Sequence, residues 1–490
     1  MNPADPIITA CPVPVAVDSP ALCVDLDGTL VKSDTLLDSI LTLIRRDPAA
    51  TLRCFLFLPQ GKAAFKAKIG RHVILDPTAL PYNRPLLEYL KAESASGRQI
   101  YLATASHEEQ AREIAEHLGF FTGVIASDAR TNLRDTNKRK ALELKFAAHG
   151  FDYVGNARPD VAALAGAKTA MLANPSLGLA AQLKRQNVMV QRTFRDRAAP
   201  MKAVAMAFRI RQWPKNLLVF APVLLAHVLL NRHYFILTSL AFVSWCFTAS
   251  ATYIINDLLD VTADRNHPSK RKRPFAAGDL SPQAGVVIVC VLLALSAMIA
   301  ARLPVRFTFW LVAYFVTTLA YSLVLKRLAL VDVITLAGLY TVRMFAGAAV
   351  AAVVFSPWLG GFSVFFFLSL AIVKRYAELD NLRKAGRIPT NGRGYRVDDL
   401  EQLRSFGTAS GYAAAVVFSL YINANPEISQ HYAHFERLWF LVPVLVFWIS
   451  RVWLLAHRGE LDEDPVVFAM TDTWSLVLGL VALVIFSIST

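Results

Sequence analysis

Two groups of acidic residues have types and spacings that suit phosphate chemistry with a divalent cation. The first is Asp25 and Asp27, which stand two residues apart directly after the apolar run Ala21–Val24, a predicted buried strand. Two carboxylates at the carboxyl end of a strand face the crevice in which open α/β sheets bind ligands. One can hold a cation while the other acts as nucleophile or acid. A plain strand-end turn is the simpler interpretation of the five residues 25–29 taken alone.

Other polar residues of the same region follow apolar runs. Thr104 ends a second predicted strand, where its hydroxyl can donate a hydrogen bond to a phosphate oxygen. Lys138 and Lys140 precede a helical pattern, and either could contact a phosphate. Asp160 follows a third apolar strand. Strand-end acid, hydroxyl, lysine and second acid therefore occur in that order.

In this order the residues resemble the haloacid-dehalogenase (HAD) phosphatase superfamily, over about residues 20–190. The resemblance implies that Asp25 is a nucleophile and that Asp27 is the general acid and base. It implies that Thr104 and Lys138 bind the phosphoryl group. It also implies that Asp160 joins Asp25 and Asp27 in holding Mg²⁺.

One residue departs from that family. Asn156 stands where the family often has aspartate, and its amide can ligate a hard cation but brings no charge. An active phosphatase is the favoured interpretation, and a structural or regulatory domain is the alternative. Residues from about 34 to 85 are expected to form a small helical cap that screens the site from water.

The second acidic group is Asp257, Asp260 and Asp264, spaced i, i+3 and i+7. A helix would place these carboxylates on one face, where they repel one another unless a cation compensates them. Mg²⁺ carrying a diphosphate would do so, and a basic run at residues 265–273 suits the same anion. A solvated acidic face is the alternative.

A further charged cluster, which contains Glu378, lies at the end of a later apolar run. It could hold a second metal ion around the same diphosphate. A helix end with mixed charges at a membrane interface is the alternative.

Composition separates the chain into two unlike parts. The chain has 490 residues, is 55% hydrophobic and carries a net charge of +14. Its high apolar fraction excludes a disordered chain. Five scattered cysteines exclude a disulfide scaffold. We predict an α/β domain over 1–190, a basic linker over 191–212 and a membrane domain over 213–490. The basic charge lies in loops between apolar runs, which favours a membrane protein over nucleic-acid binding.

Nine apolar runs predict nine transmembrane helices. Their approximate bounds are 214–231, 234–255, 283–303, 306–325, 329–353, 358–375, 407–423, 437–456 and 472–489. Lys and Arg concentrate in alternate loops, which the positive-inside rule places in the cytosol together with the N-terminal domain. The first residues lack the pattern of a signal peptide, which agrees with that topology.

The membrane part resembles the UbiA superfamily of intramembrane prenyltransferases over about 205–490. Its closer likeness is to polyprenyl-phosphate phosphoribosyltransferases, and the run NDLLDVTADRNHPSKRKRPFAAG at 256–278 carries much of it. The resemblance implies an all-α bundle in a bacterial inner membrane, with Mg²⁺ held by Asp257, Asp260, Asp264 and Glu378. The implied substrate contacts are Lys215, Asn256, Lys270, Arg271, Arg273, Tyr321, Lys326, Arg343, Lys374 and Tyr376.

Together the two resemblances imply a bifunctional enzyme. The membrane domain would transfer 5-phosphoribosyl from phosphoribosyl diphosphate to a polyprenyl phosphate, and the α/β domain would then remove the ribose 5-phosphate. An aromatic or quinone prenyltransferase is one alternative. A lipid transporter or lipid-binding protein is another.

Overall fold

The computed structural model divides the chain into two compact units, each of which is described by itself. One comprises residues 1–207 together with 257–287, and the other comprises 208–256 and 288–490. The structure describes residues 19–489 except 58, 60–64, 66–67, 128–132, 134, 385, 387–392, 425–431 and 462–464. The residues on which the signal-peptide expectation rests lie outside this set.

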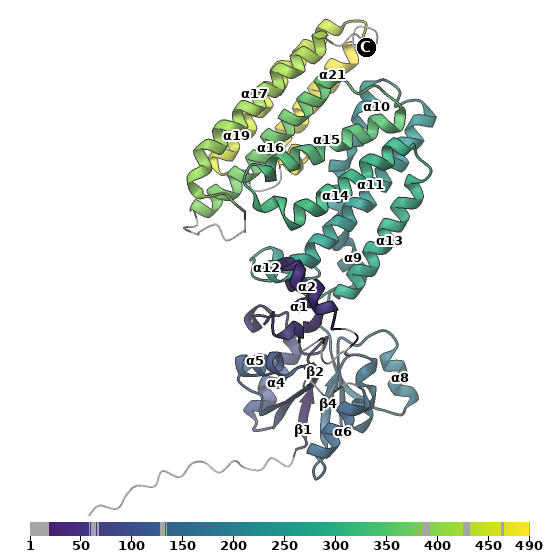
Figure 1. Ribbon diagram of the computed structural model, residues 1–490, viewed down its shortest axis with the longest axis vertical. Helices are drawn as coiled ribbons and strands as arrows, with labels where there is room; N and C mark the ends of the chain where they lie inside the picture. Colours follow the sequence, from purple (N-terminus) through teal and green to yellow (C-terminus); the bar gives the residue numbers. More distant parts are fainter. Residues whose placement is uncertain are drawn as a thin grey trace, which may run out of the picture. The chain divides into compact units, whose positions relative to one another are not determined.

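The first unit is built on a six-stranded parallel sheet in the order β3-β2-β1-β4-β5-β6 (Figure 1). The strands are β1 (Ala21–Val24), β2 (Ile100–His107), β3 (Gly123–Ser127), β4 (Phe151–Gly155), β5 (Ala170–Ala173) and β6 (Val190–Phe194). The chain leaves β1 toward β2 and β3, then returns to β4 on its other side. That reversal opens a crevice at the carboxyl ends of β1, β2 and β4.

Helices cover both faces of this sheet, as the expected α/β fold requires. They are α4 (Arg84–Ala95), α5 (Glu108–Leu118), α6 (Thr136–Lys145), α7 (Val161–Gly166) and α8 (Leu179–Arg185). Side chains alternate along a strand, so Leu22 and Val24 enter one core and Cys23 enters the other. This double burial holds β1 at the centre of the sheet.

The segment expected to form a helical cap contains α1 (Thr35–Arg46) and α2 (Pro48–Phe55). Asp34 begins α1 by accepting a hydrogen bond from the Leu37 N–H, and Asp47 begins α2 by accepting one from the Ala50 N–H. The expectation of helices here is confirmed within the described residues.

The predicted linker is wrong at its start, because β6 pairs with β5 and belongs to the sheet. In β6 only Phe194 is buried, and the three residues before it are exposed. An edge strand with one buried side chain lacks the apolar alternation by which strands are recognised. Most of the rest of the predicted linker forms α9 (Pro200–Phe208), and its residues 210–212 begin a following 3-10 segment.

The second unit is helical. Its main elements are α10 (Ala221–Leu225), α11 (Arg232–Leu259), α13 (Pro282–Ala300), α14 (Val305–Leu323), α15 (Val331–Ala351), α16 (Pro357–Lys384), α17 (Leu400–Ala424), α19 (Leu441–Arg458), α20 (Pro465–Thr471) and α21 (Thr473–Ser489), of which α11 and α13 each begin or end in the first unit. Among the described residues, six helices are long and apolar enough to cross a membrane. The count of nine spans stays a prediction.

The expected first span over 214–231 is wrong as one continuous helix. The chain there forms the 3-10 segment η4 (Ile210–Val219) and then the short α10. Pro214 and Pro222 have no N–H to donate, which accounts for the interrupted ladder of helical hydrogen bonds.

Gly347 on α15 is required by close packing. A Cβ at this position would overlap the carbonyl oxygen of Val219, whereas a Cβ at Gly338 on the same helix would meet nothing within 4 Å. The backbone oxygen cannot rotate aside as the tip of a side chain could.

We therefore expect Gly347→Ala to destabilise the helical unit by about 1–3 kcal/mol through overpacking. Gly338→Ala is the matched control and should be neutral or stabilising by up to about 1 kcal/mol, because alanine favours helix. Thermal unfolding in detergent measures both, and equal midpoints for the two variants would contradict the packing described.

Candidate active sites

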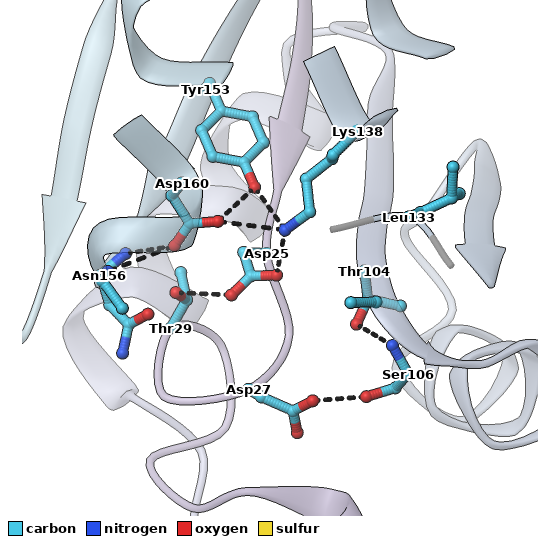
Figure 2. A network of polar contacts seen from close by, with 12 residues as sticks. Asp25, Asp27, Thr29, Thr104, Ser106, Leu133, Lys138, Tyr153, Asn156 and Asp160 are labelled. Carbon is cyan, nitrogen blue, oxygen red and sulfur yellow. Dashed lines mark hydrogen bonds and ion pairs between the residues drawn. The ribbon is translucent and has the colours of Figure 1, made fainter. Parts of the chain in front are cut away.

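The strand ends of the first unit bring the predicted phosphatase residues together (Figure 2). Asp25 directly follows β1, and Thr104 lies within β2. Asp160 ends the short turn η3 (Arg158–Asp160) that follows β4. Lys138 reaches the same place from the first turns of α6.

Lys138 is the centre of this cluster, and its side chain is almost fully buried. Its Nζ donates to Asp25 Oδ1 at 2.8 Å, to Tyr153 Oη at 2.9 Å and to Asp160 Oδ1 at 3.0 Å. These three bonds use the full donor capacity of an ammonium group. Lys140, the competing candidate, is exposed, so the structure selects Lys138.

Burial shifts the protonation of the cluster. The pKa of Asp25 is raised to about 7, mainly by loss of hydration and then by the nearby Asp160 charge, while Lys138 opposes both effects. Burial alone would lower the pKa of Lys138, but Asp25 and Asp160 outweigh it and raise that pKa. The lysine therefore stays charged and favours the ionised form of Asp25.

Asp27 is held differently from Asp25. Its Oδ1 accepts a hydrogen bond from the Thr35 N–H at 2.7 Å, and its Oδ2 accepts one from the Ser106 hydroxyl. Thr104 Oγ1 accepts from the Ser106 N–H at 3.0 Å. A partly exposed carboxylate fixed in this way can exchange protons with a ligand, which the buried Asp25 cannot do as freely.

Asp160 and Asn156 shape the opposite side of the site. Asp160 Oδ2 accepts the N–H groups of Asn156 and Ala157 at 3.1 and 3.2 Å. The Asn156 side chain lies against Gly28, where any Cβ would overlap its amide nitrogen, and Gly28 has a φ of +77°. Gly28 thus permits both the turn and the approach of this amide.

The donor chemistry fits a hard cation. Within the described part of the chain, no three His, Cys, Asp or Glu side chains gather closely enough to hold a metal ion alone. Mg²⁺ needs only one or two carboxylates, because it keeps waters and takes substrate oxygens. Asp25 and Asp160, with the Asn156 amide beside them, supply that set.

The second acidic group does not lie on a single helix, contrary to expectation. Helix α11 ends at Leu259, and Asp260 precedes the separate helix α12 (Val261–Arg265). Asp257 and Asp264 nevertheless meet, because Arg273 Nη1 lies 3.1 Å from Asp257 Oδ1 and 2.7 Å from Asp264 Oδ2. Two carboxylates around one cationic nitrogen are a suitable pair for one Mg²⁺.

The expected phosphate-binding cations of this region have different surroundings. Arg273 is engaged by the two aspartates, whereas Arg271 is exposed and Lys270 half-buried in the turn η5 (Lys270–Lys272). In the helical unit, Lys326 Nζ donates to the Asn256 side-chain oxygen at 3.3 Å.

Glu378 belongs to a charged network on α16. Arg375 Nη1 contacts Glu378 Oε2 at 2.6 Å, and Arg375 also pairs with the fully buried Asp332 of α15. Tyr321 donates to Asp332 Oδ1 at 2.7 Å. Arg393 lies 3.7 Å from both Asp332 and Glu378. The cluster seen in the sequence is thus an ordered ion network rather than a row of solvated charges.

Of the remaining predicted contacts, Arg343, Lys215 and Tyr376 are buried and Lys374 is half-buried. Arg343 is buried, donates from Nε to Asn216 Oδ1 at 2.9 Å and lies over the Tyr314 ring. Lys215 is buried with its ammonium 5.9 Å from the Tyr340 ring centroid. Lys374 is half-buried on α16. The hydroxyl of Tyr376 hydrogen-bonds His457 Nδ1 at 3.1 Å.

Sequence reasoning assigned no site role to Tyr153 or Asp332, and it included Arg375 in the charged cluster around Glu378 without assigning it a contact. Tyr153 sits in an apolar strand and reads as a core residue. Asp332 and Arg375 had a usable signal, because an ionisable residue within or beside an apolar helix is costly unless it has a partner.

Replacement of Lys138 should leave Asp25 and Asp160 facing each other without a cation, and should raise the pKa of Asp25 further. We expect Lys138→Ala to lower the free energy of unfolding by about 3–5 kcal/mol, the cost of breaking a buried ion pair. The exposed Lys140→Ala is its control and should stay within about 0.5 kcal/mol of wild type. Thermal unfolding followed by near-ultraviolet circular dichroism compares them; a matching pair of midpoints would refute the central role of Lys138.

Several known proteins resemble this chain. An uncharacterized protein, y4nM, of Sinorhizobium fredii is 35% identical over 461 residues, which cover 94% of this chain and 89% of that one. A decaprenyl-phosphate phosphoribosyltransferase of Mycobacterium tuberculosis is 32% identical over 287 residues, which cover 57% of this chain and 90% of that enzyme. A solved UbiA homolog from Archaeoglobus fulgidus, bound to GPP and Mg²⁺, covers 58% of this chain and 99% of its own, with 16% identity and a TM-score of 0.45.

A match to a family model identifies the chain more specifically than the likeness of its fold does. The model of the UbiA prenyltransferase family matches residues 217–477, more than half of the chain. With its apolar helices and its phosphoribosyltransferase relatives, this chain is a multi-pass membrane enzyme and belongs to the UbiA prenyltransferase family.

Proposed function

We propose that the chain carries out two consecutive reactions on a polyprenyl phosphate at a bacterial plasma membrane, with its N-terminal domain in the cytosol. The first transfers 5-phosphoribosyl from phosphoribosyl diphosphate to the lipid phosphate. The second removes the 5-phosphate and leaves polyprenyl-phosphoryl ribose. The similarity to decaprenyl-phosphate phosphoribosyltransferases over 82–90% of their length supports the first reaction. The Asp25–Lys138–Asp160 cluster carries the second.

In the transfer, an oxygen of the lipid phosphate attacks the anomeric carbon, and the bond from that carbon to the diphosphate oxygen breaks. The attacking oxygen is already ionised, so no base is required. Mg²⁺, held by Asp257 and Asp264 with Asp260 as a further candidate ligand, would neutralise the leaving diphosphate. Arg271 and Lys270 are suited to bind its oxygens.

In the hydrolysis, Asp25 attacks the phosphorus of the ribose 5-phosphate, and Asp27 gives its proton to the departing 5-oxygen. Asp27 then takes a proton from water, which attacks the aspartyl-phosphate and releases inorganic phosphate. Thr104 is suited to bind a phosphoryl oxygen, and Lys138 can do so when that oxygen replaces one of its three present acceptors. Mg²⁺ at Asp25 and Asp160 would offset the phosphoryl charge. The ordered hydrogen bonds of Asp27 and the buried cation at Asp25 support these separate roles.

The enzyme should incorporate ribose label from phosphoribosyl diphosphate into polyprenyl phosphate in the presence of Mg²⁺. Asp257→Asn should reduce this transfer by at least about 100-fold, since it weakens stabilisation of the leaving diphosphate. Asp25→Asn should accumulate the 5-phosphorylated lipid, with dephosphorylation slowed by about 10⁴-fold. Mass spectrometry of the extracted lipid identifies each product.

The same assay separates the other candidate activities. A prenyl diphosphate accepted in place of phosphoribosyl diphosphate would favour an aromatic or quinone prenyltransferase. Lipid bound without turnover would favour a transporter or lipid-binding protein. Unchanged dephosphorylation in Asp25→Asn would refute the assigned nucleophile.

A further inference from the structure

The aspartate-rich segment of the transferase is packed within the same compact unit as the α/β domain. Residues 257–287 belong to that unit, and α12 lies against α1 of the predicted cap (Figure 1). Asp257, Asp260 and Asp264 all lie in this segment. The segment is therefore held in place by residues of the α/β domain.

A buried ion pair forms the centre of this contact. Arg265 Nη1 lies 2.8 Å from Asp38 Oδ2, with side-chain exposures of 3% and 0%. Asp38 Oδ2 also accepts the Ser33 hydroxyl at 2.7 Å, and Arg265 Nε donates to the Ala276 carbonyl at 3.2 Å. A charged pair so fully removed from water persists only in a fixed geometry, because either charge alone would be strongly disfavoured.

A second pair of opposite polarity lies further along the same helix. Arg45 Nη1 is 3.1 Å from Asp260 Oδ1. Asp38 and Arg45 are seven residues apart, close to two helical turns, so they lie on one face of α1. In the first pair the acidic residue, Asp38, lies on α1, whereas in the second pair the acidic residue, Asp260, lies on the aspartate-rich segment. This exchange of sign fixes the register of α1 against the aspartate segment.

Neighbouring contacts continue the same interface. The Ala198 N–H donates to Asp279 Oδ1 at 3.1 Å, and Gln283 Nε2 donates to Asp34 Oδ2 at 3.3 Å. Gly278 has a φ of +74°, and a Cβ there would lie 2.6 Å from the Lys32 Cβ. The segment is therefore seated along its length and not only at the two ion pairs.

The start of α1 belongs to the other candidate site. The Thr35 N–H at its first turn donates to Asp27 Oδ1, and the Thr35 hydroxyl is 3.1 Å from Ser106 Oγ, the partner of Asp27 Oδ2. One helix of 12 residues thus contacts the proposed acid and base of the phosphatase and an aspartate of the transferase.

We propose that α1 is a positioning element shared by both sites, and that Asp38 and Arg45 are positioning residues for phosphoribosyl transfer. Asp38 acts through Arg265, the chain neighbour of Asp264, and Arg45 acts on Asp260 directly. The α/β domain is then part of the transferase as well as the enzyme for the following step. This inference rests on the proposed function for the reaction that it affects.

The test uses the full-length protein and ribose-labelled phosphoribosyl diphosphate, so that lipid product is counted whether or not it keeps its 5-phosphate. Arg45→Glu, which sets two carboxylates against each other, should lower the kcat of transfer by about 10- to 100-fold, because small misplacements of reacting groups have effects of this size. The KM for phosphoribosyl diphosphate should change less than about threefold, since the remaining phosphate-binding cations are intact. Arg46→Glu, at the exposed neighbouring position, is the matched control and should retain wild-type kcat.

Conservative replacement separates positioning from general damage to the fold. Arg45→Lys keeps one positive charge near Asp260 and should restore kcat to within about threefold of wild type. Hydrolysis of ribose 5-phosphate should be unchanged in Arg45→Glu, because Arg45 lies at the end of α1 remote from Asp27. A parallel fall in hydrolysis and transfer would mean a merely structural role and would overturn the proposal.

A second variant tests the buried pair with a structural measurement beside the activity. Asp38→Asn keeps the shape of the side chain but removes the charge opposite Arg265. Amide hydrogen exchange in residues 257–287 should then quicken by at least tenfold, and kcat of transfer should fall with it. Exchange and kcat equal to wild type would overturn the proposal.

The experiments distinguish a failure of the proposed function from a failure of the positioning role. If the wild-type chain incorporates no ribose label, the proposed function fails. If it incorporates label and both Arg45→Glu and Asp38→Asn behave like Arg46→Glu, the positioning role alone fails.

Discussion

Neutralising buried carboxylates is the constraint on which both candidate sites depend. A carboxylate removed from water is tolerated only beside a cation with suitable hydrogen bonds. Lys138 meets this requirement for Asp25 and Asp160, and Arg273 meets it for Asp257 and Asp264. In the helical unit Arg375 does so for Asp332. Each cation neutralises the acidic groups beside it and fixes their positions.

This constraint also gives Asp25 and Asp27 the different surroundings on which their proposed roles rest. Both follow the same strand, yet one is buried against a lysine and the other is half-exposed between a hydroxyl and a backbone N–H. Equal side chains thereby acquire different tasks, since a nucleophile needs a fixed position and an acid–base group needs access to protons. Local structure, more than residue type, sets the proposed roles.

Part of the first unit could be predicted from sequence, because β1 is short and wholly apolar, β2 begins with an apolar run, and polar residues follow both runs. The predicted strand Ala21–Val24 has the bounds observed for β1. Lys138 could have been separated from Lys140, because Lys138 and Leu142 are four apart and both are buried on one face of α6. Tyr153 could not have been assigned, since its hydroxyl reaches Asp160 only after β4 and η3 are assembled.

The helical part was harder to predict where an apolar run does not form one continuous helix. Residues 214–231 are apolar enough for a span, but their prolines interrupt the helix. The break at Asp260 left the three aspartates off a single helical face, and they are held instead by arginines from residues 273 and 45. The partner Arg45 is more than 200 positions away along the chain, so no local pattern could have indicated it.

The central claim is that one chain first attaches phosphoribosyl to a lipid phosphate and then removes its 5-phosphate. A time course with phosphoribosyl diphosphate that carries ¹⁴C in the ribose and ³²P in the 5-phosphate tests this most directly. Both labels should enter the polyprenyl lipid together, after which ³²P should leave as inorganic phosphate while ¹⁴C remains. Lipid that never carries ³²P, or that retains it indefinitely, would contradict the account.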